Sequence, residues 1–171
     1  DASHAFECLA DQHGGKVTRT RADLHALMIA AQEPGVILAT DGAGNFIFPE
    51  FQPVTDGLMA TAKLLEFLAT QQEPLSDLVS SLPEINMESR RVACPWEIKG
   101  SVMRRLTEIH HTGEAQEGIK LIYDEREWVL IRPDPDYPHI IITAESTSPE
   151  KLAHLHEKFQ LEVRRLRDLT E

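Results

Sequence analysis

The chain has 171 residues, of which 42% are hydrophobic and 26% are charged, and its formal net charge at pH 7 is −11. This length suits one large domain or two small ones, and the acidic balance disfavours nucleic acids and anionic membranes as partners. The sequence contains no apolar run that predicts a transmembrane helix, and its first residues do not resemble a signal peptide. Because Cys8 and Cys94 do not make a disulfide framework, we expect a cytoplasmic protein.

The first half of the sequence predicts alternating helices and strands. A helix near the N-terminus ends at Gly14-Gly15, a short strand follows at 16–20, and a second helix covers 23–32. The continuous apolar run at 36–39 is typical of a strand covered on both faces. Asp56 is placed to cap a further helix by accepting from its first backbone N–H groups. That helix should bury a stripe at helical spacing, formed by Leu58, Ala62, Leu65 and Ala69.

A polar break at 70–74 predicts a domain boundary, so the first unit spans 1–73 and a linker with some helical character spans 74–86. The second unit, 87–171, has predicted strands at 87–94, 119–123, 128–132 and 139–144. Its helices run from Pro95 to about His111 and onward from Ser148. The first unit is therefore predicted to be α/β, and the second α+β with a four-stranded antiparallel sheet and two helices on one face.

A polar turn lies between the predicted strand and the helix that Asp56 caps. Gly42 and Gly44 would let its backbone approach a ligand closely, and such loops commonly carry ligand contacts. The alternative is an ordinary connection in which Asp41 and Asn45 satisfy backbone groups of the turn itself. Both readings stay open on spacing alone.

The histidines do not form a ligand set. His110 and His111 are adjacent, and His154 and His156 are two apart on a predicted helix, so neither pair shares a face. We interpret them as surface or rim residues and predict no metal site. Trp96, at the start of a predicted helix, is expected to anchor the packing of the second unit.

Two stretches carry a resemblance to a known family. The turn at 40–45, the aromatic strand, Asp56-Gly57 and the alanine- and leucine-rich helix resemble the sugar-recognition region of the α-D-phosphohexomutases (phosphomannomutase/phosphoglucomutase). The segments 49–53 (Pro-Glu-Phe-Gln-Pro) and 94–100 (Cys-Pro-Trp-Glu-Ile-Lys-Gly) are similar to a branch fused behind a nucleotidyltransferase, of the mannose-1-phosphate guanylyltransferase type. The resemblance implies most of a third domain, truncated so that its sheet is incomplete, followed by the fourth domain.

The resemblance implies an altered sugar loop. Where the family shows Gly-Glu-x-Ser-Gly-His, Asp41 takes the place of the glutamate, Ala43 that of the serine and Asn45 that of the histidine. Asp41 and Asn45 could still meet sugar hydroxyls within the loop 41–45, although with a different reach and donor set. Arg19 takes the place of a cation that lines the family's cleft, and a solvated surface arginine is the alternative.

The implied phosphate loop is altered more strongly. The family pattern Arg-x-Ser-x-Thr-x-Pro corresponds to residues 132–138, Arg-Pro-Asp-Pro-Asp-Tyr-Pro. Arg132 is retained, whereas Asp134 and Asp136 replace the two hydroxyl residues that would bind a phosphate dianion. Two like charges about 4 Å apart repel by roughly 4 kcal/mol near a protein surface. We therefore expect Arg132 to pair with Asp134 or Asp136 rather than with phosphate.

The resemblance also separates this chain from the catalytic apparatus. A phosphohexomutase uses a phosphoserine and a Mg²⁺ motif that lie upstream in the family, so no catalytic or metal residue is predicted here. Our leading hypothesis is a non-catalytic module of a sugar-phosphate enzyme, with roles in weak hexose-phosphate binding, regulation or homo-oligomer assembly. The alternative is part of an active phosphomannomutase/phosphoglucomutase completed by upstream domains.

Overall fold

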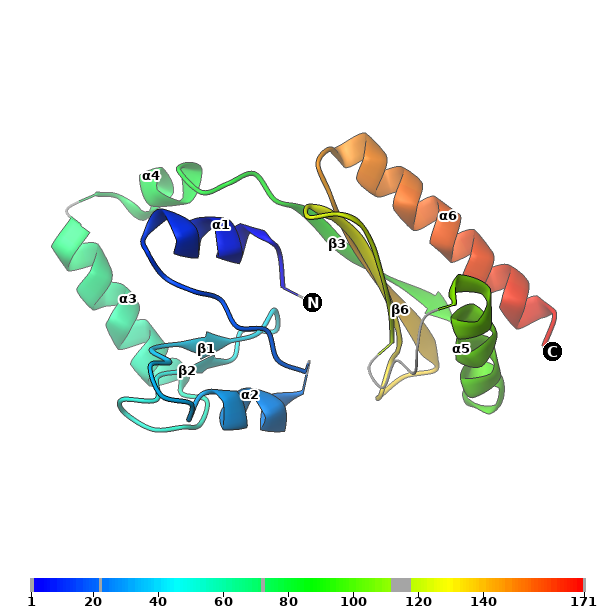
Figure 1. The fold of residues 1–171 in the computed structure, drawn as a ribbon, viewed down its shortest axis with the longest axis horizontal. Helices are drawn as coiled ribbons and strands as arrows, with labels where there is room; N and C mark the ends of the chain where they lie inside the picture. The colour runs from blue at the N-terminus through cyan, green and yellow to red at the C-terminus, as the bar shows by residue number, and fades with distance from the viewer. Residues whose placement is uncertain (1, 22, 72, 112–117, 171) are drawn as a thin grey trace. The chain divides into compact units, whose positions relative to one another are not determined.

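The computed structural model describes residues 2–21, 23–71, 73–111 and 118–170 (Figure 1). The chain divides into two compact units, 1–84 and 85–171. The helix α4 (Leu75–Ser80) lies within the predicted linker 74–86.

The first unit consists of helices and one very small sheet. Its elements are α1 (Ala5–Gln12), α2 (Leu24–Ala30), β1 (Ala39–Thr40), β2 (Phe46–Ile47), α3 (Gly57–Gln71) and α4 (Leu75–Ser80). The two strands pair antiparallel, and the core consists of Leu27, Ala31, Ala39 and Ile47. The predicted cap of α3 is confirmed, because the Asp56 carboxylate accepts from the backbone N–H of Met59 at 2.9 Å.

Three predictions for this unit were wrong. Residues 16–20 form no strand, and the apolar run at 36–39 becomes a strand only from Ala39. Ile37 is 85% exposed and Leu58 is 86% exposed, and none of the residues of α3 is buried. The expected stripe fails because the described core of this unit, which consists of Leu27, Ala31, Ala39 and Ile47, includes no residue of α3.

The second unit has the predicted architecture. Its elements are β3 (Asn86–Ala93), α5 (Trp96–His110), β4 (Ile119–Asp124), β5 (Glu127–Pro133), β6 (His139–Ser146) and α6 (Pro149–Asp168). The strands form one antiparallel sheet in the order β3-β6-β5-β4, and α5 and α6 pack on the same face of it (Figure 1).

The core of the second unit lies between this sheet and the two helices. Ile140, Ile142 and Ala144 alternate along β6 and point toward the helices, as the two-residue period of a strand requires. Phe159 and Val163 of α6 are fully buried against them. This core fixes the end of β5 and the start of β6, and hence the loop between these strands.

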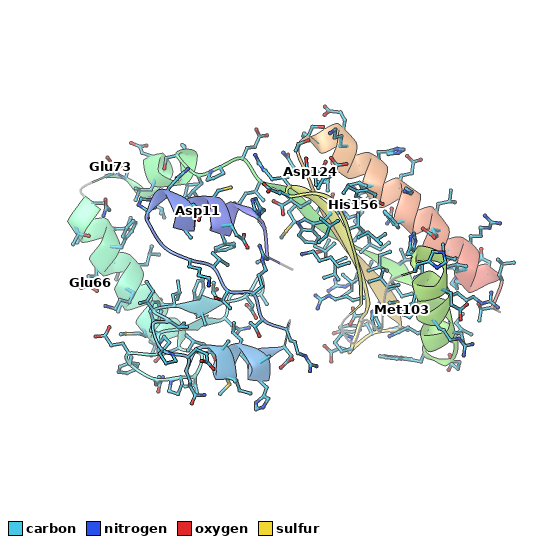
Figure 2. The ribbon with its side chains drawn as sticks, viewed as in Figure 1. Asp11, Glu66, Glu73, Met103, Asp124 and His156 are labelled. Atoms are coloured by element: carbon cyan, nitrogen blue, oxygen red, sulfur yellow. The ribbon has the colours of Figure 1, made fainter. Side chains whose placement is uncertain are left out.

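His156 corrects a further prediction. It was expected at the surface, but it is fully buried on the sheet-facing side of α6 (Figure 2). Burial, with the positive charge of Arg90, lowers the pKa of His156 below its ordinary value. The spacing of His154 and His156 shows that they lie on different faces of the helix, but it does not specify which face packs on the sheet.

Candidate functional site

The loop at 134–138 joins β5 to β6 and is the best-defined candidate site. Asp134 is only 4% exposed. One carboxylate oxygen, Oδ1, accepts from the backbone N–H of Asp136 at 3.0 Å and from that of Tyr137 at 3.1 Å. The Asp134 N–H in turn donates to the carbonyl of His139 at 3.0 Å. The carboxylate therefore fills the concave side of its own turn, while Asp136 is exposed.

Arg91 of β3 supplies the ion pair at this loop. Its Nε lies 3.4 Å from Asp134 Oδ2, and the arginine side chain is 65% exposed. Arg91 and Arg132 both pair in register with Ile141 of β6, so their side chains share one face of the sheet. Sequence reasoning considered only Arg132 for this pairing and missed Arg91, because β3 lies far away along the chain.

The charge of Asp134 is stabilised in place. Burial opposes that charge, but the N–H groups of Asp136 and Tyr137 and the guanidinium of Arg91 hold the pKa of Asp134 below its ordinary value. The carboxylate is thus an anion at neutral pH, with its donors supplied by the protein.

Lys99 of α5 lies beneath the same loop and was also missed. It is 5% exposed, and its Nζ donates to the carbonyl of Asp134 at 2.8 Å and to that of Tyr137 at 2.7 Å. The Trp96 ring centroid lies 3.4 Å from this ammonium. The predicted role of Trp96 as a packing anchor was wrong: the ring is 51% exposed and covers Lys99. Lysine is rarely buried, so the sequence did not predict this role for Lys99. The one signal that could have found it is the motif at 94–100, which contains Lys99.

The predicted sugar loop joins β1 to β2 and is organised by its own side chains. Asp41 Oδ1 accepts from the backbone N–H groups of Ala43 and Asn45, both at 2.9 Å, and Oδ2 accepts from Asn45 Nδ2 at 2.7 Å. Burial opposes the Asp41 charge, but these donors lower its pKa. Gly44 has a φ of +90°, which glycine adopts at little cost. Gly42 lies within the same turn.

Arg19, the predicted cleft cation, is tied to α1. Its Nε and Nη2 donate to the two carboxylate oxygens of Glu7, each at 2.8 Å. The guanidinium also donates to the carbonyls of Ala2 and Ser3. Through these hydrogen bonds, Arg19 attaches the segment 16–20 to α1 and to the residues just before it.

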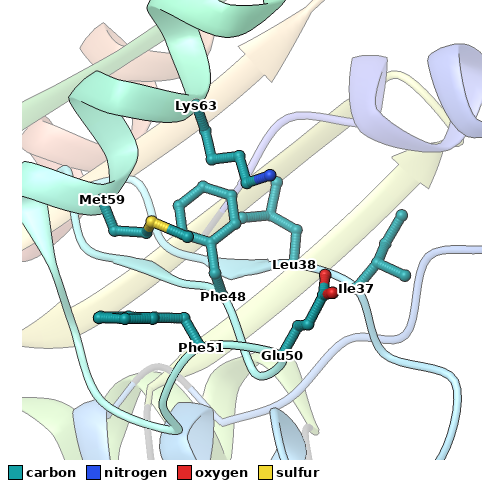
Figure 3. Close-up of a pocket in the computed structure, with 7 residues that line it drawn as sticks. All are labelled: Ile37, Leu38, Phe48, Glu50, Phe51, Met59 and Lys63. Atoms are coloured by element: carbon teal, nitrogen blue, oxygen red, sulfur yellow. The ribbon is translucent and has the colours of Figure 1, made fainter.

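An apolar hollow of about 520 Å³ lies elsewhere in the first unit (Figure 3). Its lining consists of Ile37, Leu38, Phe48, Glu50, Phe51, Met59 and Lys63. None of the predicted site residues contributes to it.

The part of the chain that the structure describes holds neither a candidate metal cluster nor a helix that could cross a membrane. Among residues 2–21, 23–71, 73–111 and 118–170, no group of three His, Cys, Asp or Glu is arranged to hold a metal ion. Within the same ranges, every helix is too short or too polar to span a bilayer.

Comparison with known proteins gives a consistent family. Residues 1–85 match the model of phosphoglucomutase/phosphomannomutase, alpha/beta/alpha domain III. The chain is similar to a probable phosphoglucosamine mutase of Methanopyrus kandleri, with 32% identity over 170 residues that cover 96% of this chain and 37% of that protein. A probable phosphoglucosamine mutase of Methanothermobacter thermautotrophicus is 31% identical over 160 residues, covering 89% of this chain and 35% of that protein.

A solved structure agrees on the fold. A phosphoglucomutase/phosphomannomutase family protein of Burkholderia thailandensis matches with a TM-score of 0.69 and 18% identity, covering 97% of this chain and 36% of that one. The chain thus spans little more than a third of the length of these relatives. Residues 1–85 therefore belong to the phosphoglucomutase/phosphomannomutase domain III family, and nearly the whole chain is similar in sequence to probable phosphoglucosamine mutases.

Proposed function

We propose that this chain is a non-catalytic phosphohexomutase module that no longer holds a sugar phosphate at the β5–β6 loop and instead serves regulation or assembly of its parent protein. One observation carries this proposal. The Asp134 carboxylate accepts the two backbone N–H groups, of Asp136 and Tyr137, that an incoming phosphate would need.

The energetics of the loop support this proposal. A phosphate dianion is bound by hydrogen-bond donors that point at it. In this turn, the backbone N–H groups of Asp136 and Tyr137 already donate to the Asp134 carboxylate. Displacing Asp134 would leave a buried carboxylate without its donors, which costs more than one ordinary hydrogen bond. Pro135 adds no N–H to the loop. The exposed Asp136 adds a second negative charge.

The β1–β2 loop supports the same reading. The side chains of Asp41 and Asn45 hydrogen-bond to each other, and Asp41 also accepts from the backbone of the turn, so fewer of their donors and acceptors are available to sugar hydroxyls. Weak hexose contact through 41–45 remains part of the proposal.

For the parent protein we propose the mannose-1-phosphate guanylyltransferase type, in which Mg²⁺ chemistry would belong to the upstream part. The support is the pair of stretches at 49–53 and 94–100. A second candidate is an active mutase completed by upstream domains, which the names of the relatives favour. Three cations near the loop, Arg91, Lys99 and Arg132, keep that alternative physically reasonable.

Calorimetric titration of the full-length protein with mannose 1-phosphate, glucose 1-phosphate and glucosamine 1-phosphate tests the proposal. We expect dissociation constants weaker than about 1 mM, equivalent to less than roughly 4 kcal/mol of binding. Micromolar binding that Arg132→Ala abolishes would overturn the proposal in favour of an active mutase.

A gain-of-binding variant sharpens the test. Asp134→Ser with Asp136→Thr restores both hydroxyls, frees two N–H groups and should improve affinity at least about tenfold. Asp124→Ser with Glu125→Thr, at the exposed end of β4 and in the turn that follows it, removes the same two negative charges and is the matched control. Equal gains in the double variant and in the control would show that long-range charge, not the loop, limits binding.

A further inference from the structure

Lys99 is a buried helix residue whose ammonium contacts two carbonyls of the β5–β6 loop and the ring of Trp96. We propose that Lys99 is the positioning residue of the β5–β6 loop, holding 134–137 in the bend that lets the Asp134 carboxylate accept its two backbone N–H groups. The structural role of Lys99 does not depend on the proposed function. Its consequence, that the loop does not offer these N–H groups to an external anion, rests on the proposed function.

The first argument is the geometry of the ammonium. An ammonium has three N–H donors, and two of them reach the carbonyls of Asp134 and Tyr137 at 2.8 and 2.7 Å. These carbonyls stand at the two ends of the bend, so one side chain ties both ends together. The ring of Trp96, with its centroid 3.4 Å from Nζ, covers the remaining side as a cation–π contact.

The second argument is burial. Lys99 is 5% exposed, so its charge is stabilised by these contacts rather than by water. Its removal would leave two carbonyls without a charged donor, and hydrogen bonds to charged groups are the stronger kind. The bend would then lose its firmest attachment to the rest of the unit.

The third argument is the rigidity of what carries Lys99. The residue sits in the first turn of α5, where its own N–H donates to the carbonyl of Pro95 at 3.0 Å. Cys94, just before the helix, donates its N–H to the carbonyl of Pro138 at 2.8 Å. The helix start and the loop end are therefore joined independently of Asp134, so the ammonium is presented from a fixed place.

Arg91 provides a contrast. It touches the same loop through one 3.4 Å contact to Asp134 Oδ2 and is largely exposed. Because the arginine side chain is largely exposed, water competes with this ion pair, and the contact reaches the carboxylate rather than a backbone group. We assign the conformation of the loop to Lys99 and only charge compensation to Arg91.

The test is hydrogen exchange followed by NMR on the ¹⁵N-labelled chain, read at the amides of Asp136 and Tyr137. In Lys99→Met, which keeps most of the side-chain volume, both amides should exchange at least about tenfold faster, because they leave the carboxylate. Lys151→Met, a change of the same kind at an exposed lysine of α6, should leave both rates unchanged. Arg91→Met should change them less than threefold or so.

A measurement on the unmodified protein covers the case in which Lys99→Met does not fold. Through-hydrogen-bond couplings from Lys99 Nζ to the carbonyl carbons of Asp134 and Tyr137 should be detectable. Their absence, or wild-type exchange rates in a folded Lys99→Met, would overturn the inference. Hexose-phosphate binding by the unmodified protein would defeat the proposed function while leaving these signals intact, so the two failures are distinguishable.

Discussion

Two loops of this molecule each fold around an aspartate, and they differ in what holds them. Asp41 in the β1–β2 loop receives hydrogen bonds from its own turn alone, through Ala43 and Asn45. Asp134 in the β5–β6 loop receives local hydrogen bonds as well, but Arg91 and Lys99 reach its loop from other elements. The first loop is a local structure, whereas the second is a tertiary one.

The supporting cores differ in the same way. Among the described residues, the core cluster of the first unit contains four buried residues beside strands of two residues each. In the described part of the second unit, a four-stranded sheet and two helices enclose a core cluster of fifteen buried residues. A loop on the larger core is held where distant side chains can meet it, so chemistry at β5–β6 is sensitive to substitutions far away along the chain.

The largest expected effect on stability comes from a substitution in the core of the second unit. Phe159→Ala removes a fully buried ring and should lower the free energy of unfolding of the second unit by about 3–5 kcal/mol. Both tryptophans, Trp96 and Trp128, lie in this unit, so urea unfolding followed by fluorescence reports on it. A loss below about 1 kcal/mol would contradict the packing described here.

A matched pair of loop variants compares the two aspartates directly. Asp134→Ala leaves two backbone N–H groups without their acceptor in a buried turn and should cost about 1–3 kcal/mol. Asp41→Ala should cost about 0.5–1.5 kcal/mol, because water can replace its hydrogen bonds. Native-state hydrogen exchange measures both, and equal costs would remove the distinction between the loops.

A pH titration sharpens the comparison of the cores. His156 has a lowered pKa in the folded state, so the unfolded state binds more protons in this range. Stability should be full above the unfolded pKa near 6.5, should fall as pH drops from there toward the lowered folded pKa, by at most about 1.4 kcal/mol per pH unit, and should level off below it. His156→Leu should flatten this slope in urea midpoints, whereas His154→Leu, at an exposed site on α6, should not.

The smallest effect is expected on α3. Leu65→Ser changes an exposed residue of this helix and should alter stability by less than about 0.5 kcal/mol, measured by thermal unfolding followed by circular dichroism. Leu106→Ser, at a fully buried leucine of α5, is the contrasting change and should be severe. A large effect at Leu65 would mean that the α3 face is covered in solution.

Local signals in the sequence were sufficient for much of the fold. Asp56 caps its helix as expected, and the helix predicted to start at Ser148 does so, with the Ser148 side chain accepting from the N–H of Lys151 at 3.3 Å. The turn at 124–127 joins β4 and β5, and the antiparallel sheet has the expected strands. These features depend on residues a few positions apart, so pattern and turn chemistry predict them.

The candidate site depended on contacts that no local pattern encodes. Arg91 meets Asp134 because β3 and β5 flank β6, and Lys99 meets the loop because α5 begins where β3 ends. His156 is buried because its face of α6 packs on the sheet, whereas Leu58 is exposed because its face of α3 packs on no other described element. The sequence by itself determined most of the helices, the strands of the second unit and the cap at Asp56, since those follow from short-range hydrogen bonding and periodicity. Only the tertiary structure decided which charges meet, because burial and pairing are properties of surfaces brought together across many residues.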